Sequence, residues 1–248
     1  MDKRQVQPVE VCFSPAVFDR FFDPQAIVLV TDILRASTAI CTAIEHDVKS
    51  IIPVPGLQQA REYKEKGFIV AAERDGEVLD FADFGNSPYY FMEDWLKGKT
   101  IAYSTTNGTQ AIQMASKTRQ VVIGSYLNLK ASCEYLKKQN RKVIILCAGW
   151  KKRFSLEDAV HAGAVVECLL QDQNFTTDCD GAKAALDLWS IAKPNLYAYI
   201  LKAAQKKRLQ KLGLDDVIEY CHTPDQSHKV PVFDSQNNKI VDVSKLSL

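Results

Sequence analysis

Carboxylate and guanidinium side chains occur in pairs directly after two apolar runs that have the length of a strand. Asp32 and Arg35 follow one of these runs, and Glu73 and Arg74 follow another. A carboxylate in this place can bind a divalent metal ion, and an arginine can bind a phosphate or carboxylate through two parallel hydrogen bonds. The alternative for Asp32 and Arg35 is structural: Asp32 would favour the helix dipole, and Arg35 would be a surface arginine. The two interpretations fit this segment equally well.

A third apolar run ends in a turn that is rich in hydroxyl groups and leads into a helix. The turn consists of Ser104, Thr105, Thr106, Asn107, Gly108 and Thr109. Free N–H groups at a helix start attract anions, a glycine lets the backbone approach a ligand, and hydroxyls add donors. The Gly-Lys-Ser/Thr ending of a Walker A loop is missing. We therefore predict an anion-binding turn; the alternative is an ordinary strand-to-helix turn with a capping threonine.

Two further segments add polar groups. Asn86 and Ser87 lie in a long irregular stretch in which Ser87 would cap a helix, and loops of this length in compact domains are often functional. Glu157 and Asp158 stand where a later helix begins. Acids are ordinary at a helix start, and the alternative is that they reach the same cleft as Asp32.

Oxygen donors without a histidine cluster favour Mg²⁺ over zinc. Asp32, Glu73 and Asp158 would supply the oxygen atoms, beside the anion-binding turn and two arginines. Hydrolysis of a phosphate ester needs this combination, because the metal ion and the donors stabilise charge on oxygen while a water attacks in line. Asp32 could instead be a covalent nucleophile, but aspartyl phosphatases usually carry a second Asp two positions on, where this chain has Leu34.

Cysteine chemistry explains the sequence less well. Cys147 and Arg153 have the spacing of the loop of cysteine-based phosphatases, but the residues between them are bulky and include only one glycine. The chain has seven cysteines, an odd number with no close pair. This pattern indicates free thiols in a reducing, cytoplasmic setting rather than a disulfide framework or a zinc site. The N-terminus lacks the apolar core of an export signal, so a cytoplasmic location is expected.

Alternating strands and helices position these residues. The expected strands are residues 9–13, 26–30, 48–54, 68–72, 100–103, 120–124 and 142–148. The expected helices are residues 37–46, 57–66, a segment from 87, 108–116, 128–139 and 155–170. The alternation predicts an α/β protein with three layers, in which helices cover both faces of a largely parallel or mixed central sheet. Ligands bind such sheets at the carboxyl ends of the strands, where the polar residues stand.

The pattern changes at about residue 172. Helical segments are expected at residues 181–191, 196–204, 206–212 and 215–221, followed by short strands at 229–233 and 239–243. The short strands should extend the sheet or cover one end of it. No linker or repeat interrupts the chain, so we predict a single domain over residues 1–248. A dense basic run is interpreted as a solvated helix face; it consists of Lys206, Lys207, Arg208 and Lys211.

The composition narrows the range of partners. A net charge of +1 and the lack of a long apolar stretch predict neither nucleic acid nor a membrane as a partner. The expected partner is a small phosphorylated substrate. Phe21, Phe22, Tyr89 and Tyr90 suit either a homodimer interface or the core.

Taken in order, these segments resemble the 2-phosphosulfolactate phosphatase family. The resemblance is carried by DILRAST (32–38), AERDG (72–76), DFGNSP (83–88), TTNGT (105–109), CAG (147–149) and SLED (155–158). It extends over roughly residues 9–170, and the tail fits more loosely. It implies a three-layer α/β/α fold, Mg²⁺ dependence, and hydrolysis of 2-phospho-3-sulfolactate to sulfolactate and phosphate. In methanogens this reaction belongs to coenzyme M biosynthesis.

The resemblance also implies a set of site residues, to which we assign roles by their chemistry. Catalytic roles fall to Asp32, Arg35, Glu73, Arg74 and Asp158. Substrate-binding roles fall to Asn86, Ser87, Ser104, Thr105, Thr106, Asn107, Gly108 and Thr109. Magnesium would be bound by Asp32, Glu73, Glu157 and Asp158. Ala72 and Ser104 stand where the family usually has Gly and Thr, which leaves room for a shifted substrate. The alternatives are a transferase or lyase acting on a related phosphorylated or sulfonated molecule, and a non-enzymatic anion sensor.

Overall fold

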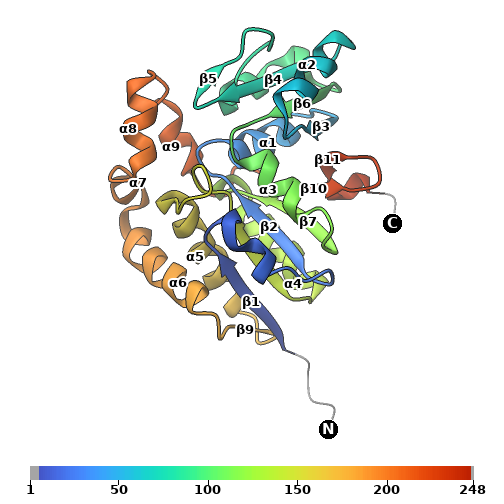
Figure 1. Cartoon of the computed structure of the whole chain (residues 1–248). Coiled ribbons are helices and arrows are strands. Elements are labelled where there is room, and N and C mark those ends of the chain that lie inside the picture. Colours follow the sequence, from blue (N-terminus) through green and yellow to red (C-terminus); the bar gives the residue numbers. More distant parts are fainter. Residues whose placement is uncertain (1–5, 247–248) are drawn as a thin grey trace.

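The computed structural model describes residues 6–246, and within this range eleven strands form one mixed sheet (Figure 1). The strands are β1 (Gln7–Cys12), β2 (Ile27–Thr31), β3 (Ser50–Pro53), β4 (Ile69–Arg74), β5 (Glu77–Val78), β6 (Thr100–Ser104), β7 (Gln120–Gly124), β8 (Val143–Cys147), β9 (Phe175–Thr176), β10 (Pro231–Asp234) and β11 (Lys239–Asp242). Their order in the sheet is β5-β4-β6-β3-β11-β10-β7-β2-β8-β1-β9. Residues 1–5, which belong to the segment on which the expected cytoplasmic location rests, lie outside the described range.

Parallel pairing builds two parts of the sheet. β7, β2, β8 and β1 pair in parallel, and so do β3, β6 and β4. β2 and β8 are buried along their whole length, because helices cover a central parallel strand on both faces. Such strands appear in the sequence as continuous apolar runs. Each expected strand therefore matches an observed one to within two residues at either end.

The β10–β11 hairpin joins the two parallel parts. β10 pairs with β7, with Val232 opposite Val122, and β11 pairs with β3, with Ile240 opposite Ile51; both pairings are antiparallel. The expectation that this pair adds strands to the sheet is confirmed, but the pair does not cover one end, because both outer edges of the hairpin are paired inside the sheet. Val232 and Ile240 are fully buried, so the hairpin belongs to the core.

Helices cover both faces of the sheet, which confirms the predicted three-layer arrangement. The α-helices are α1 (Ala36–Glu45), α2 (Leu57–Glu65), α3 (Gly108–Ala115), α4 (Leu129–Gln139), α5 (Leu156–Leu170), α6 (Asp180–Ala192), α7 (Leu196–Ile200), α8 (Ala204–Lys211) and α9 (Val217–Cys221). Val28 and Val30 of β2 pack with α1 and α3, whereas Ile27 and Leu29 pack with α4, α5 and α6. Successive residues of a strand point to opposite faces, so one strand serves two cores.

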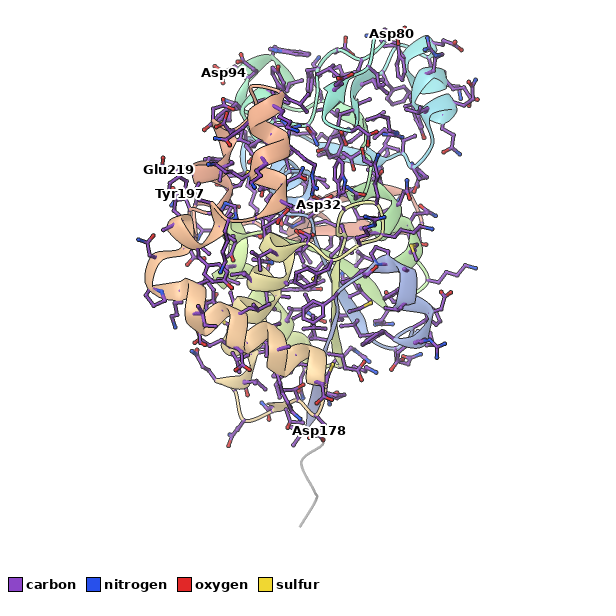
Figure 2. The ribbon with its side chains drawn as sticks, turned by 60° about the vertical axis from the view of Figure 1, so that its left-hand side comes forward. Asp32, Asp80, Asp94, Asp178, Tyr197 and Glu219 are labelled. Atoms are coloured by element: carbon purple, nitrogen blue, oxygen red, sulfur yellow. The ribbon has the colours of Figure 1, made fainter. Side chains whose placement is uncertain are left out.

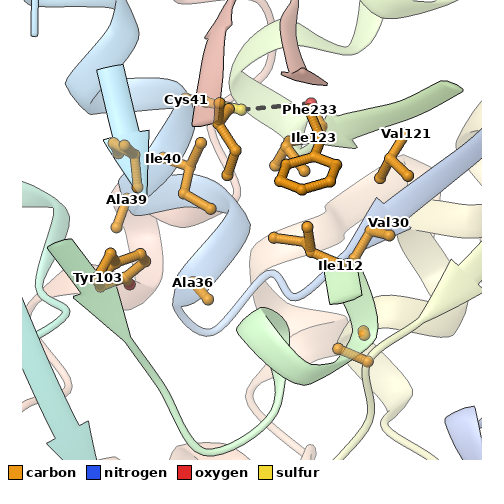
Figure 3. Packing of buried hydrophobic residues seen from close by; sticks show 14 of the residues in the cluster. Val30, Ala36, Ala39, Ile40, Cys41, Tyr103, Ile112, Val121, Ile123 and Phe233 are labelled. Carbon is orange, nitrogen blue, oxygen red and sulfur yellow. Dashed lines mark hydrogen bonds between the residues drawn. The ribbon is translucent and has the colours of Figure 1, made fainter. Parts of the chain in front are cut away.

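Figure 3 shows part of the core beneath α1 and α3. Ile40 of α1 and Ile112 of α3 lie in the same cluster as Val30 and Ile123 of the sheet. Cys41 Sγ donates a hydrogen bond to the carbonyl oxygen of Ile123 at 3.7 Å. This packing fixes the start of α1, and hence the residues that follow β2, against the sheet.

The helix expected from residue 87 is replaced by shorter turns. The 3₁₀ helices are η1 (Pro15–Arg20), η2 (Pro88–Met92), η3 (Asp94–Leu96), η4 (Tyr126–Asn128), η5 (Lys193–Asn195) and η6 (Val243–Lys245). Glu93 is extended, with φ −68° and ψ 129°, and this separates η2 from η3. The prediction of a continuous helix here is wrong, although Pro88 does begin the first turn.

Exposed aromatic residues bear on the expected homodimer. Phe22, Tyr89 and Tyr90 are 43%, 39% and 44% exposed, whereas Phe21 packs against the core. The structure describes a single copy of the chain, so the homodimer stays a prediction. No helix within residues 6–246 is both long and apolar enough to cross a membrane.

Candidate active site

The β3-β6-β4 part of the sheet runs antiparallel to the part that contains β2, and the carboxyl ends of β2, β4 and β6 converge on one small cavity. Its lining consists of Asp32, Leu34, Arg35, Glu73, Gly76, Asn86, Thr105, Asn107, Trp150 and Gln205. Asp32 lies in the middle of the molecule, away from its outline (Figure 2). The strand-end rule therefore locates the cavity, because the predicted polar residues follow the carboxyl ends of strands in both parallel parts, and both parts contribute to one lining.

Asp32 is the acid around which the cavity is built. Its side chain is 7% exposed, and its backbone N–H donates to Ser37 Oγ at 3.0 Å. Burial raises the pKa of Asp32 to about 7, and the nearby charge of Glu73 acts in the same direction. A Cβ added to Gly108 would lie 2.9 Å from Asp32 Oδ2, so the predicted turn packs directly against this carboxyl group.

Glu73 holds that turn in place. Its Oε1 accepts from the backbone N–H of Thr106 at 2.8 Å, and its Oε2 accepts from the backbone N–H of Gly76 at 2.8 Å. The Thr106 hydroxyl donates to Oε1 at 3.1 Å as well. Glu73 thus lines the cavity, but both of its oxygen atoms already join β4 to the 104–109 turn.

The 104–109 turn satisfies much of its own hydrogen bonding. The Thr105 N–H donates to Thr109 Oγ1 at 3.3 Å, and the Thr109 N–H donates to Thr105 Oγ1 at 3.2 Å. Asn107 Oδ1 accepts from the backbone N–H of Lys151 at 2.9 Å. Within residues 6–246, the N–H groups of Asn107 and Gly108, at the start of α3, make no hydrogen bond and could donate to an anion.

The two predicted arginines differ in their surroundings. Arg35 is buried and lines the cavity, and within residues 6–246 its guanidinium makes no hydrogen bond or ion pair. Arg74 is half-buried and lies outside the lining. It donates to Ser104 Oγ at 2.9 Å and to the Glu73 carbonyl oxygen at 2.6 Å. Arg35 is therefore free for a ligand, whereas Arg74 ties β4 to β6.

Asp158 and Glu157 are buried but do not line the cavity. Asp158 Oδ1 accepts from the backbone N–H of Ile33 at 2.9 Å, and Oδ2 accepts from that of Gly149 at 3.0 Å. Burial and the negative charges of Asp32 and Glu157 raise the pKa of Asp158 well above its usual value. Asp158 thus holds together the segments that follow β2 and β8, and both segments contribute lining residues to the cavity.

The expected set of four metal-binding carboxylates is not assembled. In the described part of the chain, no three or more His, Cys, Asp and Glu side chains are grouped so that they could hold a metal ion. The reason is that backbone N–H groups already bond the oxygen atoms of Glu73 and Asp158. The acids therefore act largely as anchors of the backbone.

A smaller set of oxygen atoms still fits Mg²⁺. This ion often takes one or two carboxylates, and substrate phosphate and water complete its shell. Asp32 lines the cavity together with Asn86, whose Oδ1 is buried and has no hydrogen-bond partner in the described range. An unpartnered buried oxygen beside a buried carboxyl group suits a hard cation. Ser87, expected next to Asn86 as a substrate ligand, lies outside the lining and makes no side-chain cap bond.

Sequence reasoning missed Leu34, Gly76, Trp150 and Gln205 among the lining residues. Leu34 and Gly76 stand inside the DILRAST and AERDG motifs but carry no polar side chain, and Trp150 and Gln205 lie in no motif. Gly76 has φ +95°, which an L side chain rarely adopts. As expected, the spacing of Cys147 and Arg153 does not mark the loop of a cysteine-based phosphatase. Cys147 is fully buried, and burial raises the pKa of its thiol well above the usual value, so it forms no nucleophilic thiolate.

Comparison with known proteins agrees with this arrangement. A family model described as 2-phosphosulpholactate phosphatase matches residues 13–236. A probable 2-phosphosulfolactate phosphatase of Caldanaerobacter subterraneus subsp. tengcongensis is 35% identical over 208 residues, which cover 82% of this chain and 86% of the relative. Its counterpart from Thermotoga maritima is 36% identical, with 83% and 88% covered. The counterpart from Carboxydothermus hydrogenoformans is 34% identical, with 94% and 96% covered. The predicted resemblance is thereby confirmed, and the chain belongs to the 2-phosphosulpholactate phosphatase family, whose members are phosphoric monoester hydrolases.

Proposed function

We propose that this chain is a Mg²⁺-dependent phosphatase that hydrolyses 2-phosphosulfolactate, or a closely related phosphorylated 2-hydroxy acid, to the hydroxy acid and phosphate. The observation that carries the proposal is that Arg35 and Asp32 line the same cavity. The buried Arg35 guanidinium, which makes no hydrogen bond or ion pair within residues 6–246, shares one small cavity with the buried Asp32 carboxyl group. Leaving a buried charge unpaired is costly, so the site is built for an anionic ligand.

Arg35 has the geometry to bind two oxygen atoms of a phosphoryl group at once. The N–H groups of Asn107 and Gly108 add donors at the positive end of α3. Asp32 lies against this turn, beside the place that the phosphoryl group would take. Positioning and charge stabilisation account for most of the catalysis of phosphoryl transfer, so these groups suffice to orient the ester for in-line attack by water.

Asp32 and Asn86 Oδ1 are the atoms that we propose as protein ligands of Mg²⁺. When bound, the ion would supply positive charge that stabilises the oxygen atoms of the phosphoryl group. Glu73 and Asp158 would keep the surrounding backbone in place without binding the ion. This division of roles differs from the expected four-carboxylate set and follows the hydrogen bonds of each acid.

The seven cysteines support a cytoplasmic location, because all of them are free thiols and most are buried. We place the enzyme in that compartment as part of the proposal. A fractionation experiment with intact cells would test it.

A phosphate-release assay tests the proposed function. Purified protein is incubated with 2-phosphosulfolactate or phospholactate, with Mg²⁺ or with excess EDTA, and free phosphate is measured. Arg35→Gln should lower kcat/KM by at least about 100-fold, since it removes the charge that would hold the phosphoryl oxygens. Arg141→Gln, an exposed arginine at the other end of the sheet, is the matched control. Absence of phosphate release from both substrates would refute the hydrolase, and release that persists in EDTA would refute the role of Mg²⁺.

A further inference from the structure

α8 touches the cavity at three separate points. Gln205 lines it directly, beside Asp32. The guanidinium carbon of Arg208 lies 4.6 Å from the centre of the Trp150 ring. Leu212, the residue after the helix, lies so close to Gly76 that an added Cβ there would be 2.5 Å from its Cδ1. Since Trp150 and Gly76 are lining residues themselves, α8 borders the cavity on one side, and in Figure 2 the lower end of this helix lies beside Asp32.

The cavity is too small for a substrate. Its free volume of about 10 Å³ holds roughly one water molecule. A molecule that carries a phosphate and a second acidic group needs more room than this, and displacement of α8 would provide it. α8 is suited to this movement, because Gln205 and Leu209 are its only buried residues.

A hydrogen bond within α8 fixes the direction of the Gln205 amide. Arg208 Nε donates to Gln205 Oε1 at 2.6 Å. The amide oxygen is therefore occupied, and the amide NH₂ is the group that can donate to a ligand. Arg208 keeps its four terminal N–H donors, because this bond uses only Nε. An NH₂ group and a guanidinium on neighbouring positions of one helix can bind two oxygen atoms of an acidic group.

The charges in the cavity leave a place for such a group. Among the lining residues, Arg35 is the one cation, and it stands beside the acids Asp32 and Glu73. Arg74 is bonded to Ser104 and to backbone oxygen atoms, so it is not available. A substrate with two acidic groups brings more negative charge than Arg35 can balance. Within the basic run, Lys207 and Lys211 are exposed to solvent, whereas Lys206 and Arg208 are half-buried, and Arg208 lies over the lining residue Trp150.

We propose that α8 is a mobile cover that carries part of the substrate site. Gln205 and Arg208 bind the acidic group of the substrate that is not the phosphate, a carboxylate or a sulfonate, and so select substrates that have one. The inference rests on the proposed function, because the substrate proposed there carries two kinds of acidic group. It adds two specificity residues from a part of the chain that no motif marked.

Three variants test the proposal: Arg208→Gln and Gln205→Leu, with Lys207→Gln as an exposed control on the same helix. The kcat and KM are measured for 2-phosphosulfolactate and for phospholactate, and the Kd of sulfolactate is measured by calorimetry. Arg208→Gln and Gln205→Leu should raise the KM for 2-phosphosulfolactate about tenfold or more, with kcat changed by less than about threefold. The Kd of sulfolactate should rise to a similar extent, and Lys207→Gln should leave all values within about twofold.

The two substrates identify the group that α8 binds. A rise in KM for 2-phosphosulfolactate alone assigns the sulfonate, and an equal rise for both substrates assigns the carboxylate. Unchanged KM and unchanged sulfolactate Kd in both variants would overturn the proposal, and so would a loss confined to kcat. The wild-type protein tests the proposed function separately. If it releases no phosphate but binds sulfolactate through Arg208, the function fails and the anion site stands.

Discussion

Gly108→Ala is the change that should separate catalysis from stability most clearly. Gly108 begins α3 in a backbone conformation open to any residue, so the side chain alone decides the outcome. An added Cβ would lie 2.6 Å from the Cβ of Ala36 and 2.9 Å from Asp32 Oδ2. Carbon atoms in contact prefer a separation of roughly 3.5–4 Å. The methyl group must therefore push the 104–109 turn about 1 Å away from Ala36, at the start of α1, and so displace the turn relative to Asp32.

The expected magnitudes differ for the two properties. Overpacking costs about 1–3 kcal/mol of unfolding free energy, while alanine in place of glycine in a helix contributes up to about 1 kcal/mol. The net loss is therefore about 0–2 kcal/mol, which leaves an ordinary domain folded. A displacement of about 1 Å between reacting groups can lower activity about 100-fold. The activity should thus fall far more than the stability.

Phosphate release and urea unfolding measure the two effects on the same preparation. Gly56→Ala is the control, because the added Cβ would meet only the flexible end of Gln59, with Oε1 at 3.2 Å. It should leave kcat/KM within about twofold of the wild type. The reasoning fails if Gly108→Ala keeps kcat/KM within about threefold, or if the lost activity merely equals the unfolded fraction.

Three further perturbations have expected outcomes. Cys147→Ser should keep more than half of the phosphate release, because the thiol is buried and protonated; full loss would instead indicate a cysteine nucleophile. Asp158→Ala should lower the free energy of unfolding in urea by about 2–5 kcal/mol, because two buried N–H groups lose their acceptor; a loss below about 1 kcal/mol would show that they find another. Burial lowers the pKa of His222 from 6.5 to about 4, so its contribution is complete above pH 6.5 and is lost as the pH falls toward 4. In urea unfolding at both pH values, the advantage of the wild type over His222→Gln should shrink by about 2 kcal/mol from pH 7 to pH 5, at about 1.4 kcal/mol per pH unit, and an unchanged difference would contradict the buried neutral imidazole.

The strands could be predicted from the sequence because the burial of a strand is visible in its own residues. A strand such as β8 is covered on both faces, so each of its residues is apolar and the run stands out. The residues of a strand do not show which other strands it pairs with in the sheet. β10 and β11 read as a short pair, and only the packed protein shows that β7 and β3 lie on either side of them. Pairing across more than 100 residues leaves no periodic signal.

The site residues divide in the same way. Asp32, Arg35 and Asn86 could be predicted, because the strand-end rule indicates where polar side chains gather. The sequence does not show which acid faces the cavity and which accepts backbone N–H groups, since Asp32 and Asp158 look alike as residues. Gln205 could not be found at all. It reaches the cavity only because α8 folds back against it from the C-terminal part of the chain.

The position of the β10–β11 hairpin in the sheet also means that the sheet of a newly made chain can be completed only after residues 231–242 have been synthesised. β3 and β7 are synthesised early, and each presents an open edge until residues 231–242 arrive between them. Open strand edges are templates for pairing with other chains. A growing chain therefore carries two half-sheets with unprotected edges from about residue 147 until residues 231–242 are made, and a single late hairpin closes both at once. Aggregation during production should consequently depend on how quickly the last residues leave the ribosome.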